Sequence, residues 1–510
     1  MSGRRQGWWA EIPGRCAGLA ALCLLVSCLT GRAAAPPAQG PRELTMDDVV
    51  RGKVGVLLGS VYDTYLNRKY PQAEVLQYKN VPDMILAVLR GKADAGFINC
   101  QAFPVLQKEN PQLTVLVRDV FRNPVGVGFP REQSGLRQEF NRFLAGIRAD
   151  GVYQDWYKRW FDDGNYEMPP IANSKSRGQV RIGMVSDKGL PYTILREGRL
   201  VGSDVEIAER FGAYLQKEVL YTDLEFGSLI ASAVTGKVEM ILSTIMITEE
   251  RKKQVDFSDP YFALSACVMG VKREPEAAAA PSSFLGSVAE RFESNILREK
   301  RYLLILEGLE VTAILSVFAV LLGTVLGGLI CWMRMSKRSW LQSAASIYIS
   351  VVRGIPVLVL LMIFFYVVFG RFQADPLLVA VLAFGINFAA YASEMFRTSI
   401  ESIDRGQTEA GIAGGFTRMQ TFLYIVAPQA ARRALPVYQG EVITLVKMTS
   451  IVGYIAVQDL TKAGDIIRSR TFDPFFPLLL TAVLYFCLSG LMLYLLDAAA
   501  RRAFSPRRRS

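Results

Sequence analysis

Five long apolar stretches in the second half of this 510-residue chain limit its fold more than any other feature. Most of them reach the roughly 20 residues that a helix needs to cross the hydrocarbon core of a bilayer. Inside lipid, backbone N–H and C=O groups must be paired within the protein, and a helix pairs them internally. We therefore predict an all-α transmembrane domain of about five helices over residues 301–500. The stretches are residues 311–333, 347–370, 377–393, 435–457 and 475–496.

Basic residues flank these stretches unequally. If the first stretch begins outside the cell, residues 334–338, 397–433 and 498–510 lie in the cytoplasm, and they carry most of the flanking Lys and Arg. Such residues are retained on the cytoplasmic side of a membrane. The net charge of +11 therefore reflects the orientation of the chain in the membrane, and it does not require a nucleic-acid partner. We expect a multi-pass membrane protein whose residues 501–510 form a basic cytoplasmic tail.

The N-terminus is typical of an export signal. Arg4, Arg5 and Arg15 precede a short apolar run over residues 16–26. The run ends in "LVSC", which resembles a bacterial lipobox ending at Cys28, and "RAAAP" offers a second cleavage site after Ala35. We expect residues 1–35 to contain a signal peptide that is cleaved either at the lipobox, at Cys28, or after Ala35. An uncleaved membrane anchor is the remaining alternative. Export places the following residues outside the cytoplasm.

The composition excludes catalysis and metal binding by histidine. The chain has no histidine, and it lacks the G-x-x-x-x-G-K-[ST] loop that cradles nucleotide phosphates. Of its seven cysteines, Cys100 and Cys267 are those outside the leader and the apolar stretches, and no CxxC motif occurs. We expect both to be buried free thiols, with neither a disulfide nor a metal site. We predict no catalytic residues and no bound cofactor, so any ATP is used by another subunit.

Two segments before the membrane half alternate short apolar strands with amphipathic helices. Residues 46–165 contain "KVGVLL" and "AEVLQY", and residues 178–272 contain "QVRIGMV" and "EVLYTDLEF". This alternation predicts α/β lobes with mainly parallel sheets and a binding cleft between them. The Ala- and Pro-rich residues 273–300 read as a linker to the membrane half.

The motifs in these segments resemble those of bacterial extracellular solute-binding proteins for polar amino acids. "GRLVGSDVEIAERF" and "TEERKKQVDFSDPYF" resemble their first lobe, whereas "GKADAGF" and "LRQEFNRFLAGIRADGVYQDWYKRWF" resemble their second lobe. The order is reversed here. The resemblance implies one bilobed domain with permuted lobes, lobe 2 over residues 46–165 and lobe 1 over residues 178–272.

The resemblance also implies a ligand site. Arg251 matches an arginine that holds a ligand α-carboxylate, and a solvated helix-end charge is the alternative. Asn99 occupies the place where the family usually has an aspartate for the α-ammonium, so it offers no charge pairing. The expected solute is an amino acid or a similar small polar molecule. The other residues implied are Ser243, Thr244, Met246 through its backbone, Phe226 and Ser60.

Residues 406–428, "GQTEAGIAGGFTRMQTFLYIVAP", closely resemble the EAA loop of ABC importer permeases. The resemblance implies a coupling helix that docks on a cytoplasmic ATPase, with small residues that let the partner approach closely. Permeases of this kind pair, so a second copy of the chain is also expected. An amphipathic surface helix is the alternative. The coupling residues are Glu409, Ala410, Gly411, Gly415 and Pro428.

The fourth apolar stretch contains charged residues. Glu441 and Lys447 could line a translocation pathway, because charges inside a membrane are costly and usually face a pathway or each other. "KMTS", residues 447–450, resembles the segment that lines the solute pocket in this permease branch, and the resemblance implies Ser450 as well. A structural ion pair between Glu441 and Lys447 is the alternative.

We expect the substrate-binding and permease subunit of an ABC importer in a bacterial inner membrane. A ligand-gated channel and a solute sensor are the alternatives.

Overall fold

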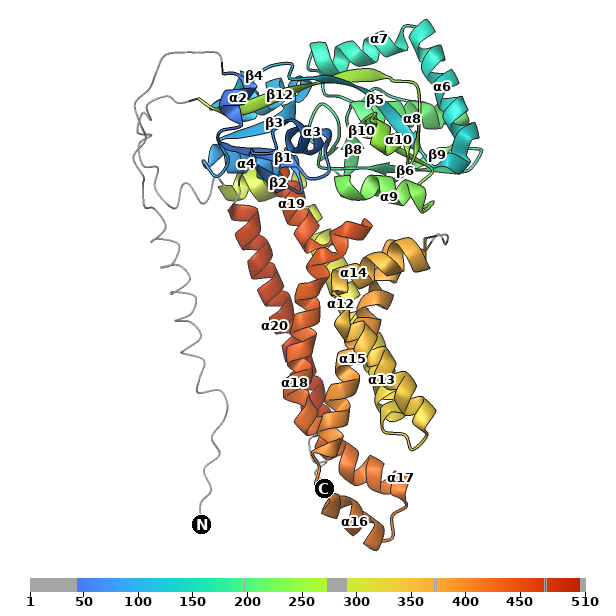
Figure 1. The fold of residues 1–510 in the computed structure, drawn as a ribbon. Helices are drawn as coiled ribbons and strands as arrows, with labels where there is room; N and C mark the ends of the chain where they lie inside the picture. The colour runs from blue at the N-terminus through green and yellow to red at the C-terminus, as the bar shows by residue number, and fades with distance from the viewer. Residues whose placement is uncertain are drawn as a thin grey trace, which may run out of the picture. The chain divides into compact units, whose positions relative to one another are not determined.

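The computed structural model describes residues 44–196, 198–272, 291–370, 372, 374–471, 473 and 475–504. The predicted signal peptide, most of the predicted linker and the last six residues lie outside the described residues. An α/β domain is followed by a mostly helical region, and this confirms the predicted fold class (Figure 1).

Ten strands of the α/β domain form one continuous sheet, and β7 (Ile194–Arg196) and β8 (Arg199–Val201) form a separate hairpin. The ten strands are β1 (Lys53–Leu57), β2 (Glu74–Tyr78), β3 (Ala95–Asn99), β4 (Leu113–Val117), β5 (Arg122–Phe129), β6 (Gln179–Met184), β9 (Glu218–Asp223), β10 (Met240–Met246), β11 (Asp256–Phe257) and β12 (Phe262–Val271).

The sheet has two halves that share β12. In the first half-sheet, residues 266–271 of β12 pair antiparallel with β3 and β4, and β1 lies parallel between β2 and β3. In the second half-sheet, residues 262–265 of β12 pair antiparallel with β5, which also pairs with β10 and β11. Strand β6 lies parallel between β10 and β9. The cores of both half-sheets are therefore tied through one strand.

These half-sheets divide the chain differently from the predicted lobes. Strand β5 comes from residues 46–165 but joins the second half-sheet, and the end of β12 returns to the first. The chain therefore passes from the first half-sheet to the second between β4 and β5, and it returns to the first within β12. Both crossing points are set by pairing between strands that are distant in the sequence, which a local sequence pattern does not reveal.

Helices of the α/β domain begin at polar caps close to strand ends. The Ser60 hydroxyl accepts a hydrogen bond from the Asp63 N–H (3.2 Å), and the Thr248 hydroxyl accepts one from the Arg251 N–H (3.2 Å). The caps fix the first turns of α3 and α10 beside the sheet. The helices are α2 (Met46–Val49), α3 (Val61–Lys69), α4 (Val81–Leu89), α5 (Phe103–Glu109), α6 (Ser134–Ala149), α7 (Val152–Tyr157), α8 (Ser203–Leu215), α9 (Leu229–Val234) and α10 (Glu249–Lys252).

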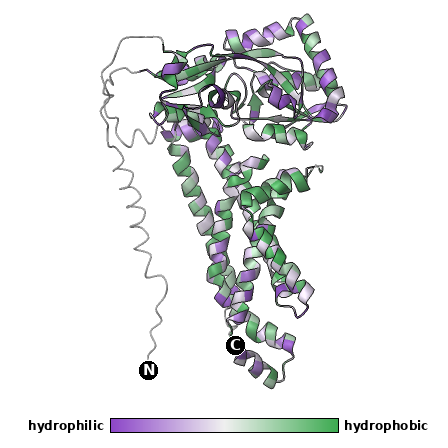
Figure 2. Cartoon of the chain, viewed as in Figure 1, coloured by the Kyte–Doolittle hydropathy of each residue, from purple (hydrophilic) through white to green (hydrophobic). Residues whose placement is uncertain are grey.

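The second part of the chain is helical and rich in apolar residues (Figure 2). Within the described residues, three helices, α12, α15 and α20, are long and apolar enough to cross a membrane, and the number rises to five if each of two bent helix pairs is one span. The helices are α12 (Tyr302–Arg334), α13 (Ser339–Gly354), α14 (Val357–Met362), α15 (Pro376–Glu401), α16 (Arg405–Ala413), α17 (Arg418–Thr421), α18 (Ala427–Met448), α19 (Leu460–Thr471) and α20 (Phe476–Phe504).

Glycines and a proline shape this bundle. Pro356 stands between α13 and α14, which are bent by 106°. On α12, a Cβ atom at Gly323 would lie 2.7 Å from the carbonyl oxygen of Gly385 on α15. A small residue is required there because it lets the two helix backbones approach closely.

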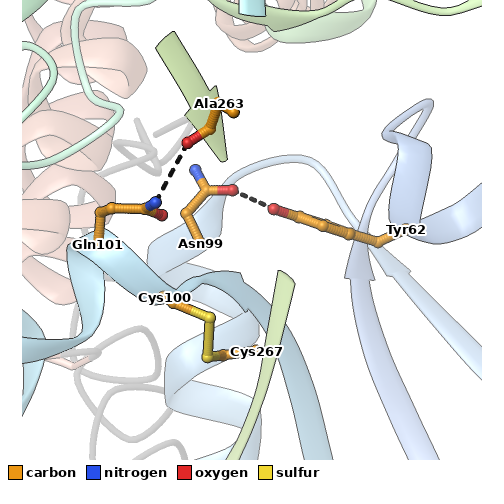
Figure 3. Close-up of a disulfide and its surroundings, with 6 residues drawn as sticks. All are labelled: Tyr62, Asn99, Cys100, Gln101, Ala263 and Cys267. Atoms are coloured by element: carbon orange, nitrogen blue, oxygen red, sulfur yellow. Dashed lines mark hydrogen bonds between the residues drawn. A yellow bond between two sulfur atoms is a disulfide. The ribbon is translucent and has the colours of Figure 1, made fainter. Parts of the chain in front are cut away.

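Cys100 and Cys267 form a disulfide, so the prediction of two free thiols is wrong. Cys267 lies on β12 opposite Ile98, and Cys100 directly follows β3 (Figure 3). The antiparallel pairing of β3 with β12 brings their Cα atoms to 5.0 Å across a sequence separation of 167 residues. Thiols stay reduced in the cytoplasm, so a disulfide is consistent with a domain that is exported from it.

We expect the Cys100→Ser/Cys267→Ser double variant to unfold more easily than the wild type. A cross-link over a loop this long contributes about 2–5 kcal/mol, mainly by restricting the unfolded chain. Urea unfolding of the purified chain, followed by tryptophan fluorescence, measures the difference. Cys487→Ser, at an exposed free cysteine, is the matched control. Identical unfolding of the double variant and the wild type would contradict a stabilising disulfide.

Candidate functional site

A cavity of about 70 Å³ lies between the two half-sheets. It adjoins a wider cavity of about 780 Å³, and Ser60, Phe226 and Arg251 line both. Six of the seven predicted ligand-binding residues line the smaller cavity, and Ser243 does not. These six are Ser60 and Asn99 from the first half of the domain, and Phe226, Thr244, Met246 and Arg251 from the second. The structure therefore gathers them at one place, whereas their binding roles remain predictions.

Arg251 lies on α10 and reaches across the cavity. Its guanidinium donates hydrogen bonds to the carbonyl oxygen of Met246 (2.9 Å) and to that of Gly59 (3.2 Å), which follows β1. The guanidinium also lies 5.5 Å from the centre of the Phe226 ring. Burial lowers the pKa of Arg251 to about 10, so the side chain stays charged near neutral pH. Arg251 is thus a partly buried cation with further N–H donors available, not a solvated helix-end charge.

Asn99 ends β3 and is already engaged. Its side-chain oxygen accepts a hydrogen bond from the hydroxyl of Tyr62 on α3 (Figure 3). Tyr62 is buried, and burial raises the pKa of its hydroxyl, which therefore remains a donor. The position predicted to face a ligand ammonium consequently presents a neutral amide whose oxygen a tyrosine occupies.

Ser243 and Thr244 lie near the end of β10 and face different surroundings. The Ser243 hydroxyl accepts a hydrogen bond from the backbone N–H of Val185 (3.2 Å), away from the cavity. The Thr244 hydroxyl donates to Asp204, a fully buried carboxylate that also accepts from the Tyr261 hydroxyl (3.0 Å). Thr244 has a φ of 49°, which is strained for a β-branched residue. The bond to Asp204 helps to hold this conformation.

Lys188 lines the same cavity, and the sequence analysis missed it. Its ammonium donates hydrogen bonds to the carbonyl oxygens of Ser243 and Thr244, the latter at 3.3 Å. Burial lowers the pKa of Lys188 to about 8, and the charge of Asp204 partly offsets this effect. Its position just beyond β6 could have been a signal, because ligands bind where loops leave the carboxyl ends of parallel strands.

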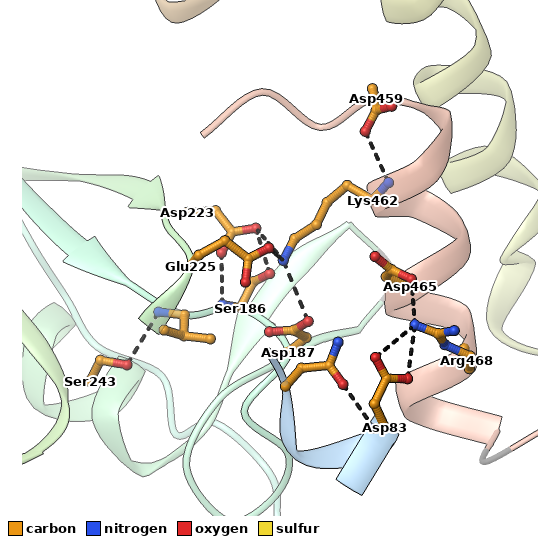
Figure 4. Close-up of polar contacts among 12 residues, drawn as sticks. Asp83, Ser186, Asp187, Asp223, Glu225, Ser243, Asp459, Lys462, Asp465 and Arg468 are labelled. Atoms are coloured by element: carbon orange, nitrogen blue, oxygen red, sulfur yellow. Dashed lines mark hydrogen bonds and ion pairs between the residues drawn. The ribbon is translucent and has the colours of Figure 1, made fainter. Parts of the chain in front are cut away.

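Helix α19 carries a cation that is buried against the α/β domain. Lys462 is 6% exposed and lies among three carboxylates of that domain (Figure 4). Its ammonium is 3.4 Å from Asp187, 3.7 Å from Glu225 and 4.0 Å from Asp223. Asp187 follows β6 and Asp223 ends β9, and both strands belong to the second half-sheet. A buried lysine is tolerated only with such partners, so the contact depends on charge complementarity.

The same helix reaches the other half of the α/β domain through Arg468. Its guanidinium lies 2.9 Å from Asp83, in the first turn of α4, and 2.7 Å from Asp465 on α19 itself (Figure 4). Helix α4 connects β2 to β3 of the first half-sheet. One helix of the membrane half therefore contacts both halves that form the cavity.

The predicted ATPase-coupling segment forms α16 and α17 with a turn between them, followed by a π-helical turn over Phe422–Val426. Glu409 and Ala410 are exposed on α16, and Pro428 lies in the first turn of α18. Two short helices therefore replace the single coupling helix that the resemblance implied.

The two glycines of this segment have internal structural roles. Gly411 is buried, and a Cβ atom there would lie 2.5 Å from the side chain of Thr421. Gly415 is exposed in the turn with a φ of 87°, which other residues rarely adopt. Gly411 permits packing inside the segment, and Gly415 permits the turn. The predicted role of both in admitting a partner surface stays a prediction.

The predicted pathway residues lie at the end of α18 and just beyond it. Glu441 and Ser450 are half-buried and Lys447 is exposed. The Ser450 hydroxyl donates to the carbonyl oxygen of Lys447 (2.9 Å). No ion pair joins Glu441 to Lys447 in the described part of the chain, so the ion-pair alternative is not what the structure shows. The pathway role stays a prediction.

Comparisons with known proteins match both parts of the chain. Residues 180–422 match the family model of bacterial extracellular solute-binding proteins, family 3. The chain is 34% identical to the "Probable amino-acid ABC transporter permease protein YckA" of Bacillus subtilis (strain 168) over 188 residues, covering 37% of this chain and 83% of that protein.

A second relative and one solved structure are also similar to this chain. The chain is 34% identical to the "L-cystine transport system permease protein TcyB" of Bacillus subtilis (strain 168) over 197 residues, 38% of this chain and 84% of that protein. It is also similar to a solved structure described as "Crystal structure of an amino acid ABC transporter with histidines". That match has 32% identity and a TM-score of 0.37, and it covers 44% of this chain and 99% of that one.

We expect Arg251→Ala to weaken solute binding by about tenfold or more. A hydrogen bond to a charged group contributes roughly 1.5–3 kcal/mol, and a tenfold change in affinity corresponds to about 1.4 kcal/mol. Titration calorimetry on the purified chain, with a solute found by a thermal-shift screen, measures the change. Lys252→Ala, at the next residue of α10, is the matched control. Equal affinity in Arg251→Ala and the wild type would remove Arg251 from the site.

Proposed function

We propose a function from one premise: this chain belongs to the family of amino-acid ABC transporter permeases, and a solute-binding domain of family 3 is fused to it. One polypeptide is then both the substrate-binding and the permease subunit of an importer for amino acids or similar small polar solutes. Family membership favours an importer over the channel and sensor alternatives.

The observation that carries this proposal is the pair of contacts made by α19. Lys462 binds carboxylates of one half of the α/β domain, and Arg468 binds Asp83 of the other. A binding domain that was merely tethered to a permease would not need a buried lysine from a membrane helix. These contacts support a working connection between the solute cavity and the permease.

In this mechanism, solute binding between the halves of the α/β domain changes their relative position. Because α19 contacts both halves, it moves with them. The segment Thr449–Ile455 lies just before α19 and contains Ser450. Movement of α19 therefore reaches the proposed pathway residues Glu441, Lys447 and Ser450. The α/β domain lies on the extracytoplasmic side in this proposal, with five membrane spans in each chain.

Energy comes from a separate cytoplasmic ATPase that docks on α16 and α17. Glu409 and Ala410 are exposed on α16, and large apolar side chains are exposed at Met419 on α17 and at Tyr424 in the following π-helical turn, at 66% and 69% exposure. Exposed apolar groups beside charged ones are typical of an interaction surface. Two copies of the chain, each docking one ATPase subunit, complete the proposed importer, and the chain itself binds no cofactor.

Lys462→Met tests the connection between the two parts. Removing one partner of a buried ion pair costs about 3–5 kcal/mol, because the carboxylates lose the cation that compensates them. We expect solute-stimulated ATP hydrolysis by the reconstituted complex to fall at least about tenfold. Solute affinity should change little, since Lys462 does not line the cavity.

Lys53→Met, at a lysine whose side chain is 51% exposed, is the control and should behave as the wild type. Lys462→Arg keeps the charge and should retain much of the stimulation. Normal stimulation in Lys462→Met would show that α19 does not transmit the solute signal.

Ala410→Trp tests ATPase docking. A large side chain on the exposed face of α16 should hold a partner away without disturbing the packing of the spans. We expect co-purification of the ATPase and solute-stimulated hydrolysis to be lost, while solute binding is kept. Ala410→Ser is the matched control. Position 415 is unsuitable because its positive φ would strain any large residue. Unimpaired recruitment by Ala410→Trp would leave α16 as an ordinary surface helix.

A further inference from the structure

The small cavity is lined by two cations and by no carboxylate, whereas Glu249 and Glu250 line the wider cavity beside it. Lys188 and Arg251 both line the small cavity, and none of its described lining residues is Asp or Glu. Their charged groups both lie 5.5 Å from the centre of the Phe226 ring, so they flank one region. Asp204 is buried behind Thr244 and does not reach the cavity surface. The electrostatic field inside the cavity therefore favours an anion.

The lysine ammonium occupies the acceptors that a ligand amine would use. Lys188 donates to the carbonyl oxygens of Ser243 and Thr244 on β10, and Thr244 lines the cavity. A ligand ammonium placed against these carbonyls would lie beside another ammonium. Two like charges this close repel each other strongly in a partly buried site.

The remaining polar groups do not supply a place for an amine. The side-chain oxygen of Asn99 accepts from the Tyr62 hydroxyl and carries no charge. The Tyr192 hydroxyl is buried at 1% exposure and lines the cavity, where it lies beside the Asn99 amide. A hydroxyl at the cavity surface can donate a hydrogen bond to a ligand oxygen.

We propose that the cavity takes a small organic acid with one or two carboxylates and no free amine, such as a 2-oxo acid, a 2-hydroxy acid or a dicarboxylate. This inference rests on the proposed function, which makes the cavity the solute site. Arg251 offers N–H donors to one carboxylate, and Lys188 and Tyr192 face the other ligand oxygens. Lys188 thereby determines specificity, since it attracts the acid and repels an amino-acid ammonium.

The test compares matched acids that differ at the amine. Titration calorimetry on the purified full-length chain uses pyruvate against alanine, malate against aspartate, and 2-oxoglutarate against glutamate. We expect at least one amine-free acid to bind at least about tenfold more tightly than its amino-acid partner. Tighter or equal binding of the amino acid in the pair that binds overturns the inference, and so does a failure of all three amine-free acids to bind.

Two variants address the residues themselves, and thermal unfolding of each confirms that it folds. Lys188→Met should lower affinity for the preferred acid by about tenfold or more, while Lys188→Arg should retain most of it. Asn99→Asp, which adds a carboxylate with almost no change of shape, should also weaken binding of the acid. Lys188→Met/Asn99→Asp should shift preference toward the amino-acid partner. Unchanged acid affinity in the folded single variants overturns the inference.

Failure of this inference differs from failure of the proposed function. An amino acid that binds and stimulates ATP hydrolysis in the reconstituted complex supports the importer and rejects the organic acid. An amine-free acid that binds without stimulating hydrolysis supports the ligand class and rejects the importer.

Discussion

The passage of β12 through both half-sheets is the constraint on which the cavity depends. Backbone N–H and C=O groups of a buried strand must be paired. Strand β12 meets this demand with β5 along residues 262–265 and with β3 and β4 along residues 266–271. The cavity lies where the chain passes from one half to the other, and the disulfide of Cys267 with Cys100 fastens that strand directly beside Asn99. The distance between Asn99 and Arg251 is therefore set by the crossing and not by either half alone.

The charges on α19 add a second demand on the same two halves. Lys462 is stable in its buried position only while carboxylates of the second half stay near it, and Arg468 depends in the same way on Asp83 of the first. Surface ion pairs contribute little because water screens them, but Lys462 is almost fully enclosed. The position of α19 is consequently sensitive to the relative placement of the halves, which is also what a ligand between them would change.

Local sequence patterns predicted the fold class, the resemblance to solute-binding proteins implied most of the cavity residues, and long-range pairing explains the rest. Thr244, Met246 and Arg251 lie in one continuous run around the end of β10, so a single motif located them together. The disulfide requires the register of β3 against β12, which no local pattern contains. Lys188 stands in no motif, and its role depends on carbonyls more than fifty residues away in sequence. Gly411 has the spacing of a coupling residue, but its contact with Thr421 exists only after the segment folds back on itself.

Three consecutive residues after β6 link the ligand cavity to the permease helix. Ser186 donates to Asp223 through its backbone N–H (2.8 Å) and its hydroxyl (2.7 Å), and this bond fixes the turn against β9 (Figure 4). Asp187 faces Lys462 on α19, whereas Lys188 faces the cavity. A ligand that draws on the Lys188 ammonium acts on a turn that also holds the carboxylate compensating Lys462. The charge that we propose selects the solute and the charge that binds α19 are therefore opposite in sign and one residue apart, so the proposed coupling needs no intermediate element between them.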